Sequence, residues 1–328
     1  MKLTYILRRL LYSAAAFGTS VIITFFLLHL MPGDYITQYL EQIYAIAPPE
    51  VVQMYNQAYG LDRPLTEQFF TYFSGVFHGD WGYSLSYSRP VLEVISEKLF
   101  WTLVILLPAT FLSIIVGIVI GAYSGWKRGS KVDLALLNGM IFLRAIPSYW
   151  LALMILLIFS YYLGIFPLGG YVSLSALDTG IDPIDVLNHA ALPIFTLFLF
   201  SVTGIYYLMR NSILMTVGED YIVTARAKGL DELTILRKHA MKNAMLPMVT
   251  SVALQCAGMI TGSIFVETIF SWPGLGMLTF EALKIRDLPL LQGILLMDTL
   301  IVIIANIAAD LIYPLIDPRV EVGEDVRK

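Results

Sequence analysis

The chain has 328 residues and a formal net charge of −4; 57% of its residues are hydrophobic and only 14% are charged. Soluble domains carry about 25% charged residues, so this composition excludes an ordinary soluble domain. The apolar residues are grouped into runs of about 20, the length of helix that crosses a hydrocarbon core of about 30 Å. We therefore expect an all-α polytopic membrane protein.

Six apolar runs predict six transmembrane helices, at 10–31, 101–123, 134–163, 191–210, 246–267 and 289–315. The first run follows a basic start like that of a signal peptide, but it is too long for the apolar core of one. We find no convincing cleavage site, so we expect this span to be retained. Cytoplasmic loops are enriched in Lys and Arg. With both termini cytoplasmic, fifteen of these residues fall inside and five outside, and this asymmetry predicts the orientation.

The spans divide the chain into four parts. Residues 1–31 hold the cytoplasmic N-terminus and the first span, and residues 32–100 form an extracytoplasmic region. Residues 101–315 form the transmembrane core of spans two to six, and residues 316–328 form a cytoplasmic tail. The second part is rich in aromatic residues, and we expect it to form short helices on the outer mouth of the protein.

The sequence contains no motif of bond chemistry. It has no GxxxxGK[ST] phosphate loop, no HExxH, no paired cysteines and no GxSxG, and its four histidines lack the spacing of metal ligands. The one cysteine, Cys256, excludes an internal disulfide. We therefore predict a protein that is not an enzyme and has no cofactor or metal of its own. We expect a protein that transports a solute, or one that holds a transporting protein.

The cytoplasmic loop 211–245 is the one long charged stretch between two spans. Gly229 ends a first short helix, and Asp231 and Glu232 open a second, where acidic groups favour the helix dipole. An apolar stripe at helical spacing is formed by Leu233, Leu236, Ala240 and Ala244. Ile235 falls on the polar side of this pattern. Such a loop either rests on anionic headgroups or docks on a partner protein.

The stretch "DYIVTARAKGL…RKHAMKNAMLP" within and just after this loop resembles the cytoplasmic EAA loop of binding-protein-dependent ABC importer permeases, specifically the dipeptide, oligopeptide and nickel branch. Further motifs follow in family order: "PGD" (32–34), "YGLDRPL" (59–65), "IPSYWLALMI" (146–155), "VETIFSWPGLG" (266–276), "RDLPLLQG" (286–293) and "DPR" (317–319). Two features depart from the wider superfamily. Val223 and Thr224 stand where Glu-Ala is typical, and the pair Leu246-Pro247 comes later than in sugar permeases. Both departures look like the peptide branch.

The resemblance implies a six-helix, type I ABC importer permease in the plasma (inner) membrane, with a small helical extracytoplasmic region after the first span. Such a subunit forms half of the pathway of an ATP-driven importer of di- or oligopeptides. Its implied partners are a homologous second permease, two ATPase subunits that bind ATP and Mg, and an extracytoplasmic solute-binding protein. The implied contact with an ATPase is made by Thr224, Ala225, Arg226, Ala227, Lys228, Gly229 and Leu230.

Three alternatives remain open at this stage. Relatives in the same branch import nickel chelates or oligosaccharides, so the cargo is not fixed by the resemblance. A stand-alone secondary carrier would show inverted repeats, and we see none. A membrane scaffold or an integral membrane enzyme is a third class, which the family motifs and the missing catalytic motifs disfavour.

Ionisable groups inside spans are costly and indicate function. Arg144 and Asp298 both fall near the middle of a predicted span, so they either form a buried pair or occupy separate water-lined positions, unless a span boundary is misplaced. Pro147 predicts a kink in the third span. Small residues in the fifth span allow close helix packing or line the pathway. The candidate pathway residues are Arg144, Gly258, Gly262, Glu267 and Asp298.

Overall fold

A computed structural model describes residues 3–30, 35–44, 48–174, 176, 180–245, 248, 251–252 and 263–316. The first part consists of α1 (Leu3–His29), α2 (Tyr35–Ile43), α3 (Pro49–Ala58), α4 (Leu65–Phe77) and an antiparallel hairpin of β1 (Tyr83–Ser84) and β2 (Arg89–Pro90). Next come α5 (Val91–Trp126), α6 (Lys131–Ala145), α7 (Ser148–Ile155), the π-helix η1 (Leu156–Tyr162) and α9 (Pro183–Val217). The last part holds α10 (Asp220–Ala227), α11 (Glu232–Thr234), the π-helix η2 (Ile235–Ala240), α12 (Met241–Ala244), α14 (Leu275–Ile285) and α15 (Leu288–Ile316).

Four helices in the described part of the chain are long and apolar enough to cross a membrane. They are α1, α5, α9 and α15, and they fall on the first, second, fourth and sixth predicted spans. Two of them start earlier than their apolar runs. α5 begins directly after Pro90, and α9 begins after Asp182, whose carboxylate accepts a hydrogen bond from the Ile184 amide at 3.0 Å. Hydropathy detects only the apolar part of a helix, whereas a cap fixes where its backbone begins.

The third predicted span is two helical pieces rather than one kinked helix. α6 and the continuous piece of α7 and η1 meet at an angle of 99°, and together they count as a fifth span if the bent pair is one crossing. The break falls at Ile146 and Pro147, because the Pro147 nitrogen has no hydrogen to donate and the residue before a proline avoids the helical region. The fifth predicted span, 246–267, lies mostly outside the described residues.

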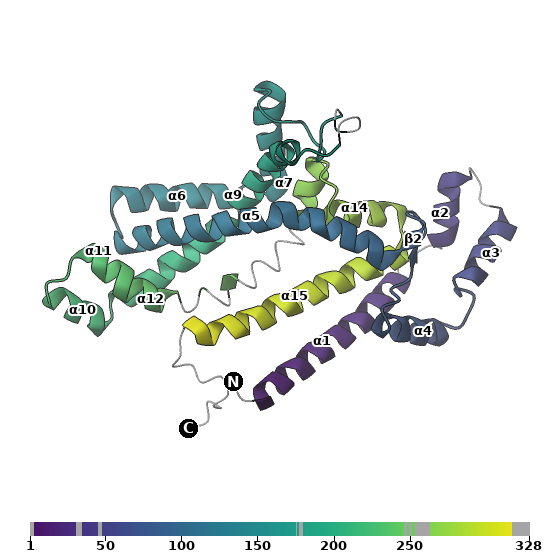
Figure 1. Cartoon of the computed structure of the whole chain (residues 1–328), viewed down its shortest axis with the longest axis horizontal. Coiled ribbons are helices and arrows are strands. Elements are labelled where there is room, and N and C mark those ends of the chain that lie inside the picture. Colours follow the sequence, from purple (N-terminus) through teal and green to yellow (C-terminus); the bar gives the residue numbers. More distant parts are fainter. Residues whose placement is uncertain are drawn as a thin grey trace.

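The centre of the molecule is the packing of α5 against α9. Gly117, Gly121 and Gly125 recur every four residues on α5 and face α9. A Cβ atom on Gly121 would lie 2.7 Å from the Tyr206 carbonyl oxygen, and one on Gly125 would lie 2.8 Å from the Arg210 carbonyl oxygen. The two backbones are therefore in contact, as small residues at four-residue spacing allow in membrane helices. Around this contact α1 and α15 lie side by side, joined by a 2.8 Å hydrogen bond between Ser20 Oγ and Thr299 Oγ1 (Figure 1).

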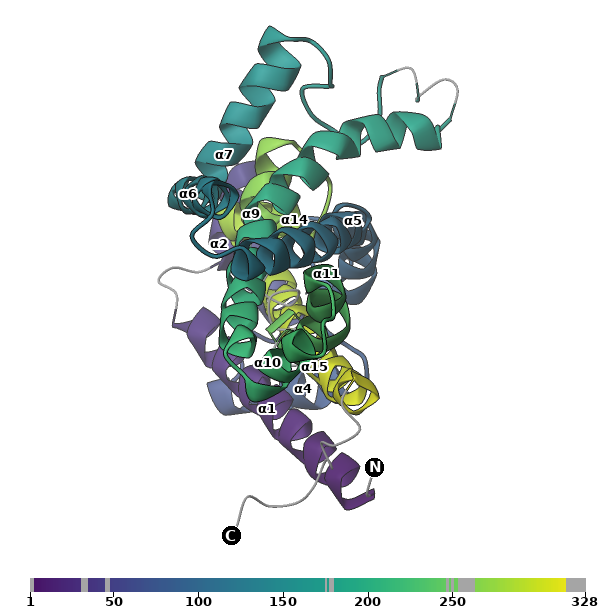
Figure 2. The same cartoon turned by 90° about the vertical axis from the view of Figure 1, so that its left-hand side faces the viewer.

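Two small regions lie at opposite ends of the long axis (Figure 1). One end holds residues 35–90, which comprise α2, α3, α4 and the β-hairpin and are called the hairpin region below. The other end holds residues 220–244, from α10 to α12, called the charged segment. Viewed from the end of the charged segment, α7 projects to one side of the bundle (Figure 2).

The hairpin region is fastened to the start of α15 by Asp287, which is buried. Its Oδ2 accepts hydrogen bonds from Ser84 Oγ at 2.7 Å, Ser86 Oγ at 2.7 Å and the Ser86 amide at 3.1 Å. Its Oδ1 accepts from the Leu290 amide at 3.2 Å in the first turn of α15. One carboxylate thus satisfies both the turn of the hairpin and a free amide of a helix N-terminus.

Candidate functional site

The charged segment begins three residues after α9 ends and folds as two short helical pieces around Gly229. Gly229 has φ +75°, a backbone conformation that favours glycine, and it reverses the chain between α10 and α11. Asp231 caps α11: its Oδ2 accepts the Thr234 amide at 2.9 Å. The hydrogen bonds from Thr234 hold the pKa of the Asp231 carboxyl below its usual value. The turn and the cap agree with the sequence prediction for this loop.

The inner face of the charged segment differs from the predicted stripe. Ile235, predicted on the polar side, is completely buried, whereas Leu233 is 53% exposed. The reason is the π-helical turn η2, in which hydrogen bonds join residues five apart. Ile235 and Ala240, five residues apart, therefore share the inner face, where they pack with Met209 and Ile213 of α9. The rest of the predicted stripe is correct, because Leu236, Ala240 and Ala244 are buried.

The outer face of the charged segment is the α10–α11 turn. Of the seven residues predicted to contact an ATPase, Ala225 is buried against the segment's own core; the other six are exposed, namely Thr224, Arg226, Ala227, Lys228, Gly229 and Leu230. Arg226 crosses the turn to Glu232, with Nε 3.0 Å from Oε1, and its guanidinium lies over the ring of Trp126 at 5.3 Å. Five of these six residues, 226–230, are consecutive and form the turn at this end of the molecule (Figure 1).

A buried polar network joins α5, α6 and α9 beside the charged segment. Asp133 is 1% exposed, and its carboxylate receives a two-point contact from Arg210: Nε donates to Oδ1 at 2.9 Å and Nη2 donates to Oδ2 at 3.0 Å. Ser124 Oγ also donates to Asp133 and is hydrogen-bonded to the Tyr206 hydroxyl at 2.7 Å. The Gly129 amide donates to Asp133 at 2.9 Å. In the sequence Arg210 is only one of the charges that predict the orientation, and no pattern links it to a carboxylate 77 residues away.

Glu267 is buried and serves as the cap of α14. Its carboxylate accepts hydrogen bonds from Thr102 Oγ1 at 2.9 Å, Ser263 Oγ at 3.0 Å, and the amides of Gly276 and Met277 at 2.6 and 3.1 Å. A Cβ atom on Gly276 would lie 2.7 Å from the Cα atom of Ile264, so this turn of the "WPGLG" motif requires glycine. The predicted pathway residue Glu267 is thus placed inside the protein, between α5 and α14.

Arg144 and Asp298 are not brought together. Arg144 is exposed in the last turn of α6, with its guanidinium over the ring of Tyr207 at 5.6 Å. Asp298 lies on α15, and its buried Oδ1 has no hydrogen-bond partner among the described residues. The predicted pair rested on a depth counted along the third span, whereas the 99° bend puts Arg144 at a helix end. Gly258 and Gly262, also predicted for the pathway, lie outside the described residues.

Two family profiles together match nearly the whole chain. The inner membrane component of binding-protein-dependent transport systems matches residues 117–322, and the N-terminal membrane component of such systems matches residues 2–106. The chain belongs to the binding-protein-dependent transport permeases. As a member of this family it is a non-catalytic, integral inner-membrane subunit of an ABC importer.

The permease is similar over almost its full length to known peptide permeases. It is 33% identical to the oligopeptide transport system permease protein AppB of Bacillus subtilis, covering 97% of this chain and 99% of that one. It is 34% identical to the dipeptide transport system permease protein DppB of Escherichia coli K12, covering 97% and 98%. A solved structure of the MetNI methionine ABC transporter, in an inward-facing conformation, matches the permease with a TM-score of 0.51. That match covers 69% of this chain and 97% of that chain at 17% identity, and it shows a shared fold.

Proposed function

We propose that this permease forms half of the translocation pathway of an ATP-driven importer of di- or oligopeptides. The full-length similarity to an oligopeptide and a dipeptide permease supports the cargo class. In this proposal a second, homologous permease supplies the other half of the pathway, and an extracytoplasmic solute-binding protein delivers the peptide. Both termini and the loop 211–245 are cytoplasmic, and residues 32–100 lie on the outer side.

The charged segment is proposed to be the coupling element that seats in an ATPase subunit. The observation that carries this proposal is the exposed surface of the α10–α11 turn, built on a face that is packed against α9. The inner face fixes the segment to a membrane-spanning helix, and the outer face is available to a partner. Movement of the ATPases would then be passed to α9 as a rigid-body displacement. The position of the segment at the end opposite the hairpin region supports its placement on the cytoplasmic side.

Gly229→Pro is expected to uncouple ATP hydrolysis from peptide uptake. Proline fixes φ near −65°, whereas Gly229 has φ +75°, so the substitution must rebuild the turn that presents the outer face. The spans should still insert, because a Cβ atom at Gly229 would meet nothing within 4 Å in the described structure. The measurement is uptake of labelled peptide and ATPase activity by the reconstituted complex. We expect uptake to fall by at least about tenfold, which corresponds to about 1.4 kcal/mol of activation free energy, while ATP is still hydrolysed.

Arg226→Glu is a second variant of the same surface, and Lys127→Glu is its matched control. Lys127 is an exposed cation in the turn between α5 and α6, outside the charged segment. Arg226→Glu replaces the ion pair to Glu232 by repulsion and should also reduce uptake, whereas Lys127→Glu should leave uptake unchanged. Normal uptake by both Gly229→Pro and Arg226→Glu would refute the coupling role of the segment.

One experiment can identify both the partners and the cargo. Gentle affinity purification of the permease from its native membrane, followed by mass spectrometry, should recover two ATPase subunits, a second permease and a solute-binding protein. A peptide retained by the binding protein would support the proposed cargo, whereas a nickel chelate or an oligosaccharide would replace it. A permease recovered alone and competent for transport in liposomes would contradict the importer proposal.

The residues proposed to line the pathway remain Arg144, Gly258, Gly262, Glu267 and Asp298. Asp298 is the strongest of the described three, because a buried carboxylate oxygen without a hydrogen-bond partner is costly unless a ligand or a moving helix satisfies it. Glu267 lies within electrostatic reach of Asp298, but its own carboxylate is already occupied by four donors. We assign to Glu267 the role of holding α14 against α5, and to Asp298 contact with the cargo.

A further inference from the structure

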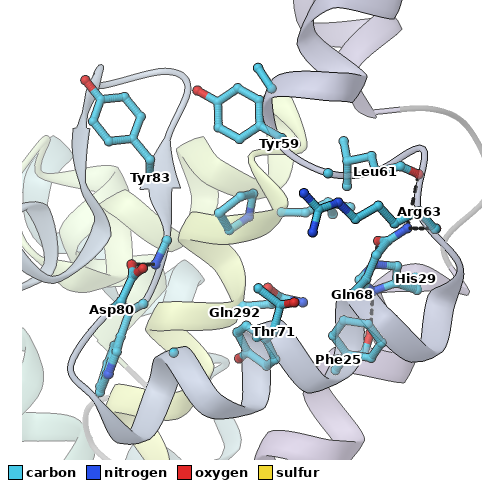
Figure 3. Close-up of a pocket in the computed structure, with 18 of the residues that line it drawn as sticks. Phe25, His29, Tyr59, Leu61, Arg63, Gln68, Thr71, Asp80, Tyr83 and Gln292 are labelled. Carbon is cyan, nitrogen blue, oxygen red and sulfur yellow. Dashed lines mark hydrogen bonds between the residues drawn. The ribbon is translucent and has the colours of Figure 1, made fainter.

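A cavity of about 570 Å³ lies between the hairpin region and the ends of α1 and α15 (Figure 3). This volume is within the range of about 300–1,000 Å³ that is typical of small-molecule sites. Its walls include aromatic side chains, among them Tyr59, Trp81 and Tyr83. Gly60 and Gly82 also line it, with φ of +66° and +88°, and their lack of side chains leaves the space open. None of these residues belongs to the charged segment or to the proposed pathway set.

The floor of the cavity carries a polar side chain, Gln292, whose amide has no hydrogen-bond partner among the described residues. Gln292 is 7% exposed and projects from α15 into the cavity (Figure 3). Its amide makes no hydrogen bond to any other described residue, although it offers both a donor and an acceptor. The neighbouring Gln68 differs, since its Nε2 donates to the carbonyl oxygens of Leu61 and Arg63 at 3.1 and 2.8 Å. A side-chain amide that faces a cavity with its donor and acceptor both free indicates a site for a ligand that supplies partners.

Opposite charges flank this amide. The Arg63 guanidinium reaches over the cavity from one side, and Asp80 lies on the other side, with Gln292 between them (Figure 3). Arg63 is 55% exposed and donates one hydrogen bond to exposed Glu67 at 3.1 Å. Exposed pairs of this kind contribute little, so the remaining donors of the guanidinium are available to a ligand. Asp80 accepts the Gly82 amide at 3.0 Å through Oδ1, and its Oδ2 has no partner in the described part of the chain.

We propose that this cavity binds a short peptide with both termini free. The peptide carboxylate would pair with Arg63, its ammonium group with Asp80, and a peptide group with the amide of Gln292, while an apolar side chain packs on the aromatic wall. A molecule with one charge only would leave unused either the Asp80 carboxylate or the remaining donors of Arg63. The assignment rests on the proposed function, because it makes the cavity a receiving site for the imported peptide on the outer side of the permease.

The experiment measures binding of labelled Ala-Phe to the full permease in lipid nanodiscs by equilibrium dialysis, without ATPases or binding protein. N-acetyl-Ala-Phe and Ala-Phe amide are the blocked probes. Ala-Phe should bind at least about tenfold more tightly than either blocked form, because each blocked form loses one charged hydrogen bond. Arg63→Gln should weaken Ala-Phe binding by about tenfold but leave Ala-Phe amide unaffected. Asp80→Asn should do the same for Ala-Phe and leave N-acetyl-Ala-Phe unaffected.

Two further variants complete the design. Gln292→Leu removes the floor amide and should weaken all three probes to a similar extent. Arg89→Gln is the matched control, because Arg89 is an exposed arginine of the same hairpin region that pairs with Glu97 at 2.9 Å outside the cavity. It should bind Ala-Phe like the unmodified permease. Each variant is first compared with the parent by its elution volume in detergent, so that unfolded protein is not scored as loss of binding.

Equal binding of free and blocked probes, or equal affinity of Arg63→Gln and Arg89→Gln, would overturn the site. If Arg63→Gln instead weakened docking of the solute-binding protein with peptide affinity unchanged, the cavity would receive a partner side chain and the proposal would again be wrong. The two proposals fail separately. ATP-driven uptake without binding in nanodiscs refutes only the cavity, and binding by a permease that recruits no ATPases refutes only the importer.

Discussion

Replacing Gly121 by alanine is expected to destabilise the permease by about 1–3 kcal/mol, the cost of overpacking a close contact. The added Cβ atom would lie 2.7 Å from the Tyr206 carbonyl oxygen and 3.0 Å from Cβ of Met209. The first of these atoms belongs to the backbone of α9 and cannot rotate away, so α5 and α9 must separate. Gly121→Leu should prevent assembly of a stable permease altogether.

The same substitution at Gly139 is the matched control and should have the opposite sign. Gly139 also lies inside a helix, α6, but a Cβ atom there would meet nothing within 4 Å in the described structure. Gly139→Ala should therefore stabilise the chain by about 0.5–1 kcal/mol, because alanine loses less backbone entropy in a helix. The measurement is the free energy of unfolding of the purified chain in mixed micelles. Equal effects at both positions would mean that α5 and α9 are not in backbone contact.

Breaking the Asp133–Arg210 pair is expected to cost about 3–5 kcal/mol, the penalty for leaving one partner of a buried ion pair alone. Asp133→Asn turns an amide NH₂ toward the guanidinium or the Gly129 amide, so that two donors face each other. Arg210→Gln leaves the Asp133 carboxylate buried with only its hydrogen bonds from Ser124 and Gly129. The double variant Asp133→Asn/Arg210→Gln should lose much less than the sum of the two single effects.

An exposed pair in the same part of the molecule is the control. Arg226 and Glu232 are joined at 3.0 Å, close to the 2.9 Å of Arg210 and Asp133, but their side chains are 43% and 52% exposed. Arg226→Gln should therefore change the free energy of unfolding by about 0–1 kcal/mol. Thermal and denaturant unfolding of the four variants, measured in parallel, separates the effect of burial from that of distance. Similar losses for Arg226→Gln and Arg210→Gln would contradict the assignment of the network as buried and structural.

The sequence predicted those helices and turns that follow from a local property of the chain. Apolar length placed α1, α5, α9 and α15, and turn chemistry placed Gly229 and the Asp231 cap. The loop motif together with the other motifs in family order indicated the permease family, which the family profiles confirm.

The remaining features depend on pairing between distant residues or on backbone geometry that has no signature. The π-helical turn shifted Ile235 to the inner face, and no residue type marks such a turn. Asp133 and Arg210 meet only because α5, α6 and α9 pack together. The four-residue spacing of glycines on α5 is visible in the sequence and is the signal that could have revealed the α5–α9 contact. The bend at Pro147 was foreseen as a kink, but its angle of 99° depends on how α6 packs.

α5 touches both ends of the permease. It is one continuous helix of 36 residues, which corresponds to about 54 Å of axial length. At its first residue, Val91 packs against Gly293 of α15, next to the cavity; at its last, the ring of Trp126 lies under the guanidinium of Arg226. The glycines that contact α9 lie in the half of α5 toward Trp126, so a displacement of α9 would carry this half with it. In the proposed coupling, a displacement begun at the charged segment would therefore reach the mouth of the permease through the backbone of one helix, without a relay of side-chain rearrangements.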